Sequence, residues 1–109
     1  MSNADLSVSA VSGSLFSSQR LFVQGPCYAN PSTDQVSLRF NPKGLMTRSI
    51  GGIYVSADTV ISKHLAVFRQ PVMPELEPGW YTLTIVVNNI EVTSLTADFL
   101  LCKFFRPNS

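Results

Sequence analysis

The chain is poor in charged residues, and it lacks long apolar runs and a secretion signal. Charged residues make up 14% of the 109 residues and the formal net charge is +1, whereas soluble domains have about 25% charged residues. This balance excludes a polybasic nucleic-acid arm and an acidic disordered tail. No apolar run approaches the ~18–20 residues needed to cross a bilayer, so we expect no membrane span. The start, Met1 to Asp5, has neither a basic nor an apolar segment, which favours a cytoplasmic location.

Residues that catalysis or metal binding would need are scarce and scattered. His64 is the single histidine, and no C-x-x-C or H-x-x-x-H spacing is present, so we expect a surface histidine and no metal site. Glu75 and Glu77 fall in a turn, where solvation is expected rather than acid–base catalysis. Gly51-Gly52 lacks the helix and lysine of a phosphate-binding loop. The sequence therefore predicts a protein that is not an enzyme and that holds no cofactor.

The two cysteines, Cys27 and Cys102, allow one disulfide. A bridge closing so long a loop would add on the order of 4–5 kcal/mol in the loop-entropy model. The missing secretion signal favours two free, buried thiols instead. Cys102 lies in an apolar stretch, residues 99–105, where a free thiol packs as a small hydrophobic side chain.

Apolar and polar residues alternate with a period of two along most of the chain, and no convincing helical pattern occurs. The clearest strands are residues 36–40 and 80–87, and Asn88-Asn89 suits a tight hairpin after the second. Further strands are expected at residues 6–10, which Ser12-Gly13-Ser14 ends, and at residues 20–24, 53–55, 59–61, 65–68 and 97–105. About seven short strands predict an all-β, antiparallel sandwich. We expect one domain over residues 5–106, a leader or disordered tail at residues 1–4, and a tail at residues 107–109.

One motif has a specific geometry. In the stretch from Leu76 to Tyr81, Pro78 and Gly79 fit the two central positions of a type II turn, in which the glycine takes a positive φ. Tyr81 follows two residues later and begins a strand. This arrangement resembles the tyrosine corner of immunoglobulin-like (Ig-like) sandwiches, where the phenol hydroxyl bonds to backbone a few residues upstream. The resemblance makes Tyr81 the corner tyrosine and Leu76 the upstream core residue; a plain turn is the alternative.

A wider resemblance rests on the order of the strands. A strand ending at Gly25, a strand at residues 36–40, an apolar stretch leading to prolines at residues 65–74 and the motif around Tyr81 follow one another. This order is similar to that of the transcription-factor-type Ig-like (IPT/TIG) domains and of the C-terminal Ig-like domain of HU-related Bacteroidetes proteins. The chain departs from them at Gly25-Pro26-Cys27, which stands in place of a longer polar loop, and we expect no HU-like helical domain within these 109 residues. The resemblance implies a spacer or interaction module without chemistry.

A basic and aromatic group of residues raises the alternative of nucleic-acid binding. The sequence places three basic residues, Arg39, Lys43 and Arg48, close to the aromatic residues Phe40 and Tyr54. An OB-like barrel uses such a surface to bind single strands, because bases stack on its aromatic side chains. Phe40 belongs to a buried alternation, however, and the nearly neutral chain lacks the basic balance of a phosphate binder. We therefore expect no nucleic-acid partner. A carbohydrate- or ligand-binding sandwich of the cell surface is a further alternative, which a disulfide would favour.

The last expected strand is apolar on both faces from Phe99 to Phe105. A strand of a two-layer sandwich needs one apolar face, so the second indicates an interface. Lys103 shares a face with Phe99, Leu101 and Phe105, and we expect this face to be the outer one. The sequence therefore predicts a non-catalytic interaction or structural module within a larger protein or assembly. Its association with a protein partner, or with itself, is expected to use Phe99, Leu101, Lys103 and Phe105.

Overall fold

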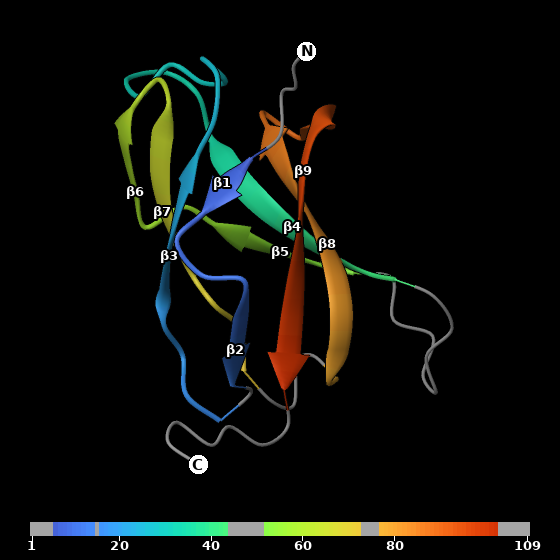
Figure 1. Cartoon of the computed structure of the whole chain (residues 1–109). Helices are drawn as coiled ribbons and strands as arrows, with labels where there is room; N and C mark the ends of the chain where they lie inside the picture. Colours follow the sequence, from blue (N-terminus) through green and yellow to red (C-terminus); the bar gives the residue numbers. More distant parts are fainter. Residues whose placement is uncertain (1–5, 15, 44–51, 73–76, 103–109) are drawn as a thin grey trace.

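The computed structural model describes residues 6–14, 16–43, 52–72 and 77–102, and these residues form strands, turns and loops but no helix. They build two sheets that pack around one apolar core (Figure 1). The strands are β1 (Ser7–Val8), β2 (Ser12–Ser14), β3 (Arg20–Gln24), β4 (Val36–Pro42), β5 (Ile53–Ser56), β6 (Thr59–Ser62), β7 (Leu65–Arg69), β8 (Gly79–Val87) and β9 (Ile90–Cys102). The predicted all-β class is confirmed, and the described residues form nine strands where about seven were expected.

The four-stranded sheet has the order β1-β3-β7-β6, and the five-stranded sheet has the order β2-β9-β8-β4-β5. Neighbouring strands are antiparallel except β2 and β9, which run parallel with Ser12 opposite Leu100. The expectation of a purely antiparallel fold is therefore wrong for this pair. The reason is that the N-terminal segment changes sheets, because Ser7–Val8 pairs with β3 and Ser12–Ser14 pairs with β9.

Ser12-Gly13-Ser14 forms strand β2, although the sequence pattern predicted a break there. The side chain of Gln70, buried at the end of β7, donates from Nε2 to the carbonyl oxygen of Ser14 (2.7 Å). Nε2 of Gln19 donates to Oε1 of Gln70 (2.9 Å) and to the carbonyl oxygen of Ser12 (3.1 Å). These bonds, here called the Gln70 network, hold β2 in place through side chains of the other sheet.

The core follows from the alternation that the sequence shows. Inward residues of β3, β4, β7, β8 and β9 are buried, and the largest fully buried side chains include Tyr81, Phe40, Phe68 and Phe99. The Phe40 ring meets Tyr81 and Phe99 edge-to-face, with ring centroids 6.4 Å and 6.1 Å apart. Each such pair contributes about 0.5–1.5 kcal/mol beyond the burial of its apolar area. The aromatic cluster therefore fixes β4, β8 and β9 relative to one another.

The predicted hairpin turn between β8 and β9 is confirmed. Asn88 and Asn89 have φ values of 52° and 70°, the positive pair that a two-residue type I′ turn requires. The Asn88 side chain accepts from the Gln35 N–H (2.9 Å) and donates to Asp34 Oδ1 (3.0 Å). A hydrogen bond from the Asn30 backbone and one from Asn88 lower the pKa of Asp34. The turn is thereby fastened to the loop that precedes β4.

Two tyrosine hydroxyls bond to backbone a few residues upstream. The Tyr81 hydroxyl donates to the carbonyl oxygen of Glu77 (2.5 Å) and accepts from its N–H (3.1 Å), so the predicted bond to upstream backbone is confirmed. Gly79 has a positive φ of 143°, more extended than the ~80° of a type II turn. Leu76 lies outside the described residues. Tyr28 bonds similarly to the carbonyl oxygen of Val23 (2.8 Å), and burial raises its pKa to about 12.

Candidate interaction surface

The outward face of β9 is the opposite of the one that the sequence predicted. Phe99 is 0% exposed and Leu101 is 1% exposed, because both side chains point into the core between the sheets. Leu100 and Cys102 are half-buried and belong to the outer face. The expectation that Phe99 and Leu101 form an external interface is therefore wrong. Lys103 and Phe105, which the same prediction included, lie outside the described residues.

The outer face of the five-stranded sheet carries two exposed aromatic side chains. Tyr54 on β5 is 57% exposed, and Trp80 on β8 is 50% exposed. Between them the paired positions Arg39 and Thr84 face the same way, and Leu100 of β9 is the register partner of Trp80. We call this surface, formed by Tyr54, Arg39, Trp80 and Leu100 around the buried Thr84, the aromatic face.

The register gives the dimensions of the aromatic face. Tyr54 is opposite Arg39, Arg39 is opposite Thr84, and Trp80 lies four residues before Thr84 on β8. The two aromatic residues are therefore separated by about 13 Å along the strands and by about 10 Å across two strand spacings, or about 16 Å in all. This span matches a contact surface for a macromolecule or for several linked units of a smaller ligand.

Charges on the aromatic face are paired within the chain. Nη1 of Arg39 forms an ion pair with Oε2 of Glu91 on β9, and its guanidinium carbon lies 5.6 Å from the centroid of the Tyr54 ring. Nζ of Lys43 lies 3.2 Å from Oδ1 of Asp98. Arg39 thus connects three strands and is held in one position between its partners.

A glycine allows the chain before β5 to lie close to Arg39. Gly52 has a φ of 93°, and a Cβ added there would lie 3.0 Å from the carbonyl oxygen of Phe40 and 3.2 Å from Nε of Arg39. A larger residue would be strained in this backbone conformation and would press against both groups. Gly52 therefore helps to fix the arginine at the centre of the aromatic face.

The basic group considered for nucleic-acid binding does not form an open cationic surface. Arg39 and Lys43 each face a carboxylate, and Arg48 lies outside the described residues. Phe40 is fully buried, as its position in the alternation predicted, and Tyr54 packs against the arginine. Phosphate contacts would have to compete with Glu91 and Asp98 for these cations.

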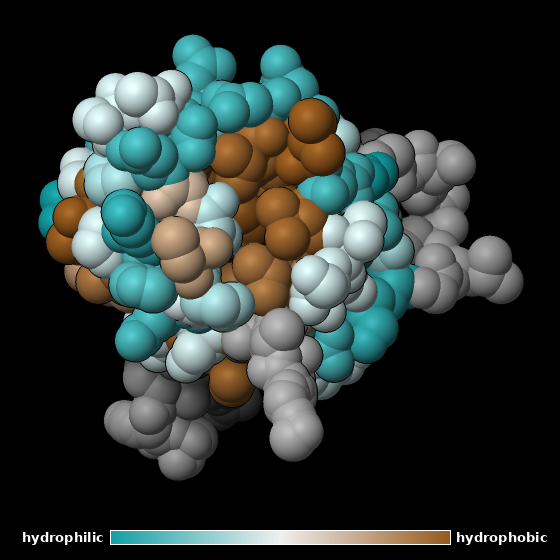
Figure 2. Space-filling model, turned by 90° about the horizontal axis from the view of Figure 1, so that it is seen from above, coloured by the Kyte–Doolittle hydropathy of each residue, from teal (hydrophilic) through white to brown (hydrophobic). Residues whose placement is uncertain are grey.

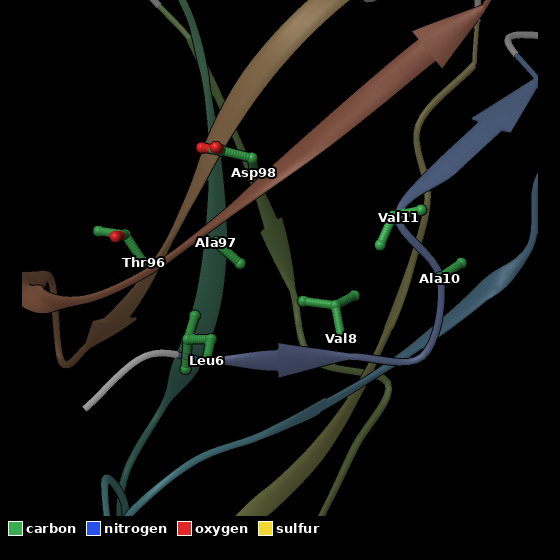
Figure 3. Close-up of a pocket in the computed structure, with 7 residues that line it drawn as sticks. All are labelled: Leu6, Val8, Ala10, Val11, Thr96, Ala97 and Asp98. Carbon is green, nitrogen blue, oxygen red and sulfur yellow. The ribbon is translucent and has the colours of Figure 1, made fainter. Parts of the chain in front are cut away.

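A cleft of about 370 Å³ opens between the N-terminal segment and β9 (Figure 3). The N–H of Leu6 donates to the carbonyl oxygen of Thr96 (3.2 Å), and the N–H of Leu100 donates to that of Val11 (3.0 Å). Between these bonds the N-terminal segment leaves β9 to pair with β3. The side chains of Leu6, Val8 and Ala97 project into the cleft, whereas those of Thr96 and Asp98 point away from it. Five of the seven lining residues are apolar, and Asp98 is the one charged residue among them.

The upper end of the molecule also exposes apolar side chains. Seen from above, they form a continuous area bordered by polar residues (Figure 2). The β8–β9 hairpin lies at this end (Figure 1), and Ile90, the first residue of β9, is exposed.

The remaining predicted residues lie apart from one another. His64 is exposed, and its Nδ1 lies 3.2 Å from the carbonyl oxygen of Gly25. Cys27 and Cys102 are free, as expected, but Cys27 is exposed and Cys102 is only half-buried, so the expectation of two buried thiols is wrong for Cys27 and met only in part for Cys102. Glu77 takes part in the backbone bonds to Tyr81, and Glu75 lies outside the described residues.

Within residues 6–14, 16–43, 52–72 and 77–102, no three histidine, cysteine or carboxylate side chains are grouped as a metal site would require. The same residues include no helix that could span a membrane. Comparison of the sequence with models of protein families and with curated proteins finds no match.

Proposed function

We propose that the chain is an Ig-like domain that serves as a non-catalytic interaction module. The order β1-β3-β7-β6 corresponds to strands A, B, E and D of that fold, and the run β9-β8-β4-β5 corresponds to strands G, F, C and C′. The bond from Tyr81 to the backbone of Glu77 has the place of the tyrosine corner at the start of strand F. The chain differs from antibody domains in its free cysteines and in its exposed tryptophan.

The aromatic face is the surface that this module uses to bind a protein partner. Trp, Tyr and Arg are the residue types that most often dominate the binding energy of protein interfaces. Trp80, Tyr54 and Arg39 lie on the same outer face of the five-stranded sheet, and this is the observation that carries the proposal. The ion pair with Glu91 fixes the arginine in advance, so binding costs less side-chain entropy.

Two other functions are less well supported. An OB-like nucleic-acid binder would need unpaired cations beside its aromatic residues, whereas Arg39 and Lys43 face carboxylates. A carbohydrate-binding domain would also use exposed aromatic rings on one face of a sheet, but Thr84, which lies between them, is only 6% exposed and offers a sugar little hydrogen bonding. The test below separates a protein partner from a sugar.

Photo-crosslinking from the aromatic face tests the proposal. Benzoylphenylalanine placed at Tyr54 in the native full chain should give adducts with a protein, or with a second copy of the chain. The same probe at Ser32, an exposed loop position, should not give these adducts. Trp80→Ser should abolish them, because it removes the second aromatic contact. Equal adducts from both positions, adducts that survive Trp80→Ser, or none at all would refute the proposal.

The tryptophan itself provides the second measurement. Trp80 is the single tryptophan of the chain and is 50% exposed, so its fluorescence reports directly on the aromatic face. Protein binding should shift its emission to shorter wavelength and protect it from acrylamide. Saturable protection by a soluble oligosaccharide, without a protein adduct, would favour the carbohydrate-binding function instead.

A further inference from the structure

A second apolar surface lies on the opposite side of the molecule, on the outer face of the four-stranded sheet. Phe22 on β3 is 41% exposed, and Ile61 on β6 is 52% exposed. Val67 on β7 is the register partner of Phe22 and lies outside the core cluster, so it faces the same way, although it is only 7% exposed beneath its neighbours. We call Phe22, Ile61 and Val67 the Phe22 patch.

The Phe22 patch forms the floor of a hollow. The hollow has a volume of about 290 Å³, and Arg20, Asp58 and Thr59 complete its lining. Thr59 is the second register partner of Val67, so three adjacent strands contribute to the surface. Alternation alone would place polar residues at these outward positions, as it does at Gln24 of β3. The patch is therefore apolar and concave on a face that borders solvent.

Two arginines, Arg20 and Arg69, lie beside each other at one end of the hollow. Arg20 and Arg69 are register partners on neighbouring strands, both are exposed, and both face outward. Like charges directly opposite each other destabilise a sheet. The carboxylate of Asp58 is 3.9 Å from Nη2 of Arg69, whereas Arg20 forms no ion pair with any residue that the structure describes. The pair therefore keeps an uncompensated positive charge next to the Phe22 patch.

We propose that this face binds an acidic segment of a partner protein. An apolar side chain of the segment occupies the hollow over Phe22, and a neighbouring carboxylate lies between Arg20 and Arg69. A carboxylate there relieves the repulsion of the two guanidinium groups, and arginine can bind it through two parallel hydrogen bonds. The aromatic face offers no such charge, because its cations are paired within the chain.

The charge pattern favours a peptide over a nucleic acid. A phosphate backbone presents a regular row of charges and would need several cations in line. Here the hollow is apolar, and Asp58 lies in its lining. A segment in which carboxylates alternate with apolar side chains matches both the hollow and the arginine pair.

A titration with a synthetic peptide tests the proposal. The probe is a blocked peptide in which aspartate alternates with phenylalanine and leucine, added to the ¹⁵N-labelled chain. We expect saturable shifts of amides in β3, β6 and β7 at peptide concentrations below about 1 mM. A matched peptide with lysine in place of aspartate should cause none of these shifts. Binding of the lysine peptide, shifts confined to β4 and β8, or no saturable shift would overturn the proposal.

Matched charge variants separate a local site from general attraction. Arg20→Glu should weaken binding by about tenfold or more, and Ile61→Thr should weaken it while keeping a β-branched residue on the strand. Lys63→Glu makes the same change in net charge at an exposed position away from the arginine pair, and we expect less than about a twofold effect. Dispersed amide spectra confirm that each variant is folded. An equal loss in Lys63→Glu, or tighter binding of a single-stranded oligothymidylate to the same amides, would overturn the proposal.

Discussion

Replacement of Gly13 by alanine should destabilise the domain far more than its small size suggests. A Cβ at this position would lie 1.9 Å from Oε1 of Gln70 and 2.5 Å from Nε2 of Gln19. The Gln70 amide would have to rotate away, or β2 would have to leave β9. Rotation breaks the bond to the carbonyl oxygen of Ser14 (2.7 Å) and the bond from Gln19 (2.9 Å).

The magnitude follows from the groups left without partners. Each buried polar group that loses its hydrogen bond costs about 1–3 kcal/mol. Two such groups sum to about 2–6 kcal/mol, and because both bonds are only part-buried, Gly13→Ala should lower the free energy of unfolding by about 2–4 kcal/mol, in the lower part of that range. For a domain of this size the melting temperature should fall by about 10–20 °C. Ser7→Ala, at an exposed position of the same N-terminal segment, is the matched control and should stay within about 0.5 kcal/mol of the parent.

A double-mutant cycle tests the physical cause. Urea unfolding followed by Trp80 fluorescence gives the midpoint for each variant, and the slope of the free energy with urea should not change. Gln70→Ala alone should cost about as much as Gly13→Ala, because it breaks the same network. Since Gln70→Ala also removes the obstructing oxygen, Gly13→Ala should cost under about 1 kcal/mol in that background. Costs that simply add, or a single variant as stable as the parent, would show that the Gln70 network does not hold β2.

Three further outcomes are expected. Tyr81→Phe should lower the free energy of unfolding by about 0.5–1.5 kcal/mol in urea, because the bonds to Glu77 are lost, and an unchanged midpoint would contradict this role. The pKa of Tyr28 is about 12 in the folded chain against about 10 when exposed, so the protonated hydroxyl stabilises the folded state fully below pH 10, and this stabilisation is lost as the pH rises towards 12. The urea midpoint should therefore fall between pH 10 and pH 12, and it should fall less in Tyr28→Phe. Leu101→Glu should unfold the domain whereas Leu100→Glu stays folded by circular dichroism, and the reverse result would contradict the assigned faces of β9.

Local patterns in the sequence were sufficient to predict the central strands and which of their side chains are buried. The alternation at Val36, Leu38 and Phe40 places these side chains in the core, and the inward residues of β8 follow the same rule. Asn88-Asn89 indicated the hairpin because asparagine tolerates the positive φ that the turn requires. These features depend on residues close together in the chain, which is why the sequence alone predicts them.

Features set by distant residues could not be predicted in this way. Strand β2 has no apolar side chain, and its side-chain support comes from Gln70, which directly follows β7 of the other sheet. Between Phe99 and Phe105 both alternating sets are apolar, so alternation gave two equal choices, and Lys103 favoured the wrong one. The contact of Phe99 with Phe40 decides the face, and it joins strands far apart in sequence. The two surfaces proposed for binding likewise combine residues of three or more strands.

The change of sheet by the N-terminal segment has a consequence for the order of folding. The β8–β9 hairpin closes across two residues, and β4 then adds to β8, whereas Ser12 meets Leu100 from the far end of the described chain. Closing a longer loop costs more entropy, and pairings between distant residues slow folding. On a ribosome, β2 is among the first strands made, yet its partner is the last strand described. The domain therefore completes its second sheet only once β9 has been synthesised. Until then β2 has no strand to pair with.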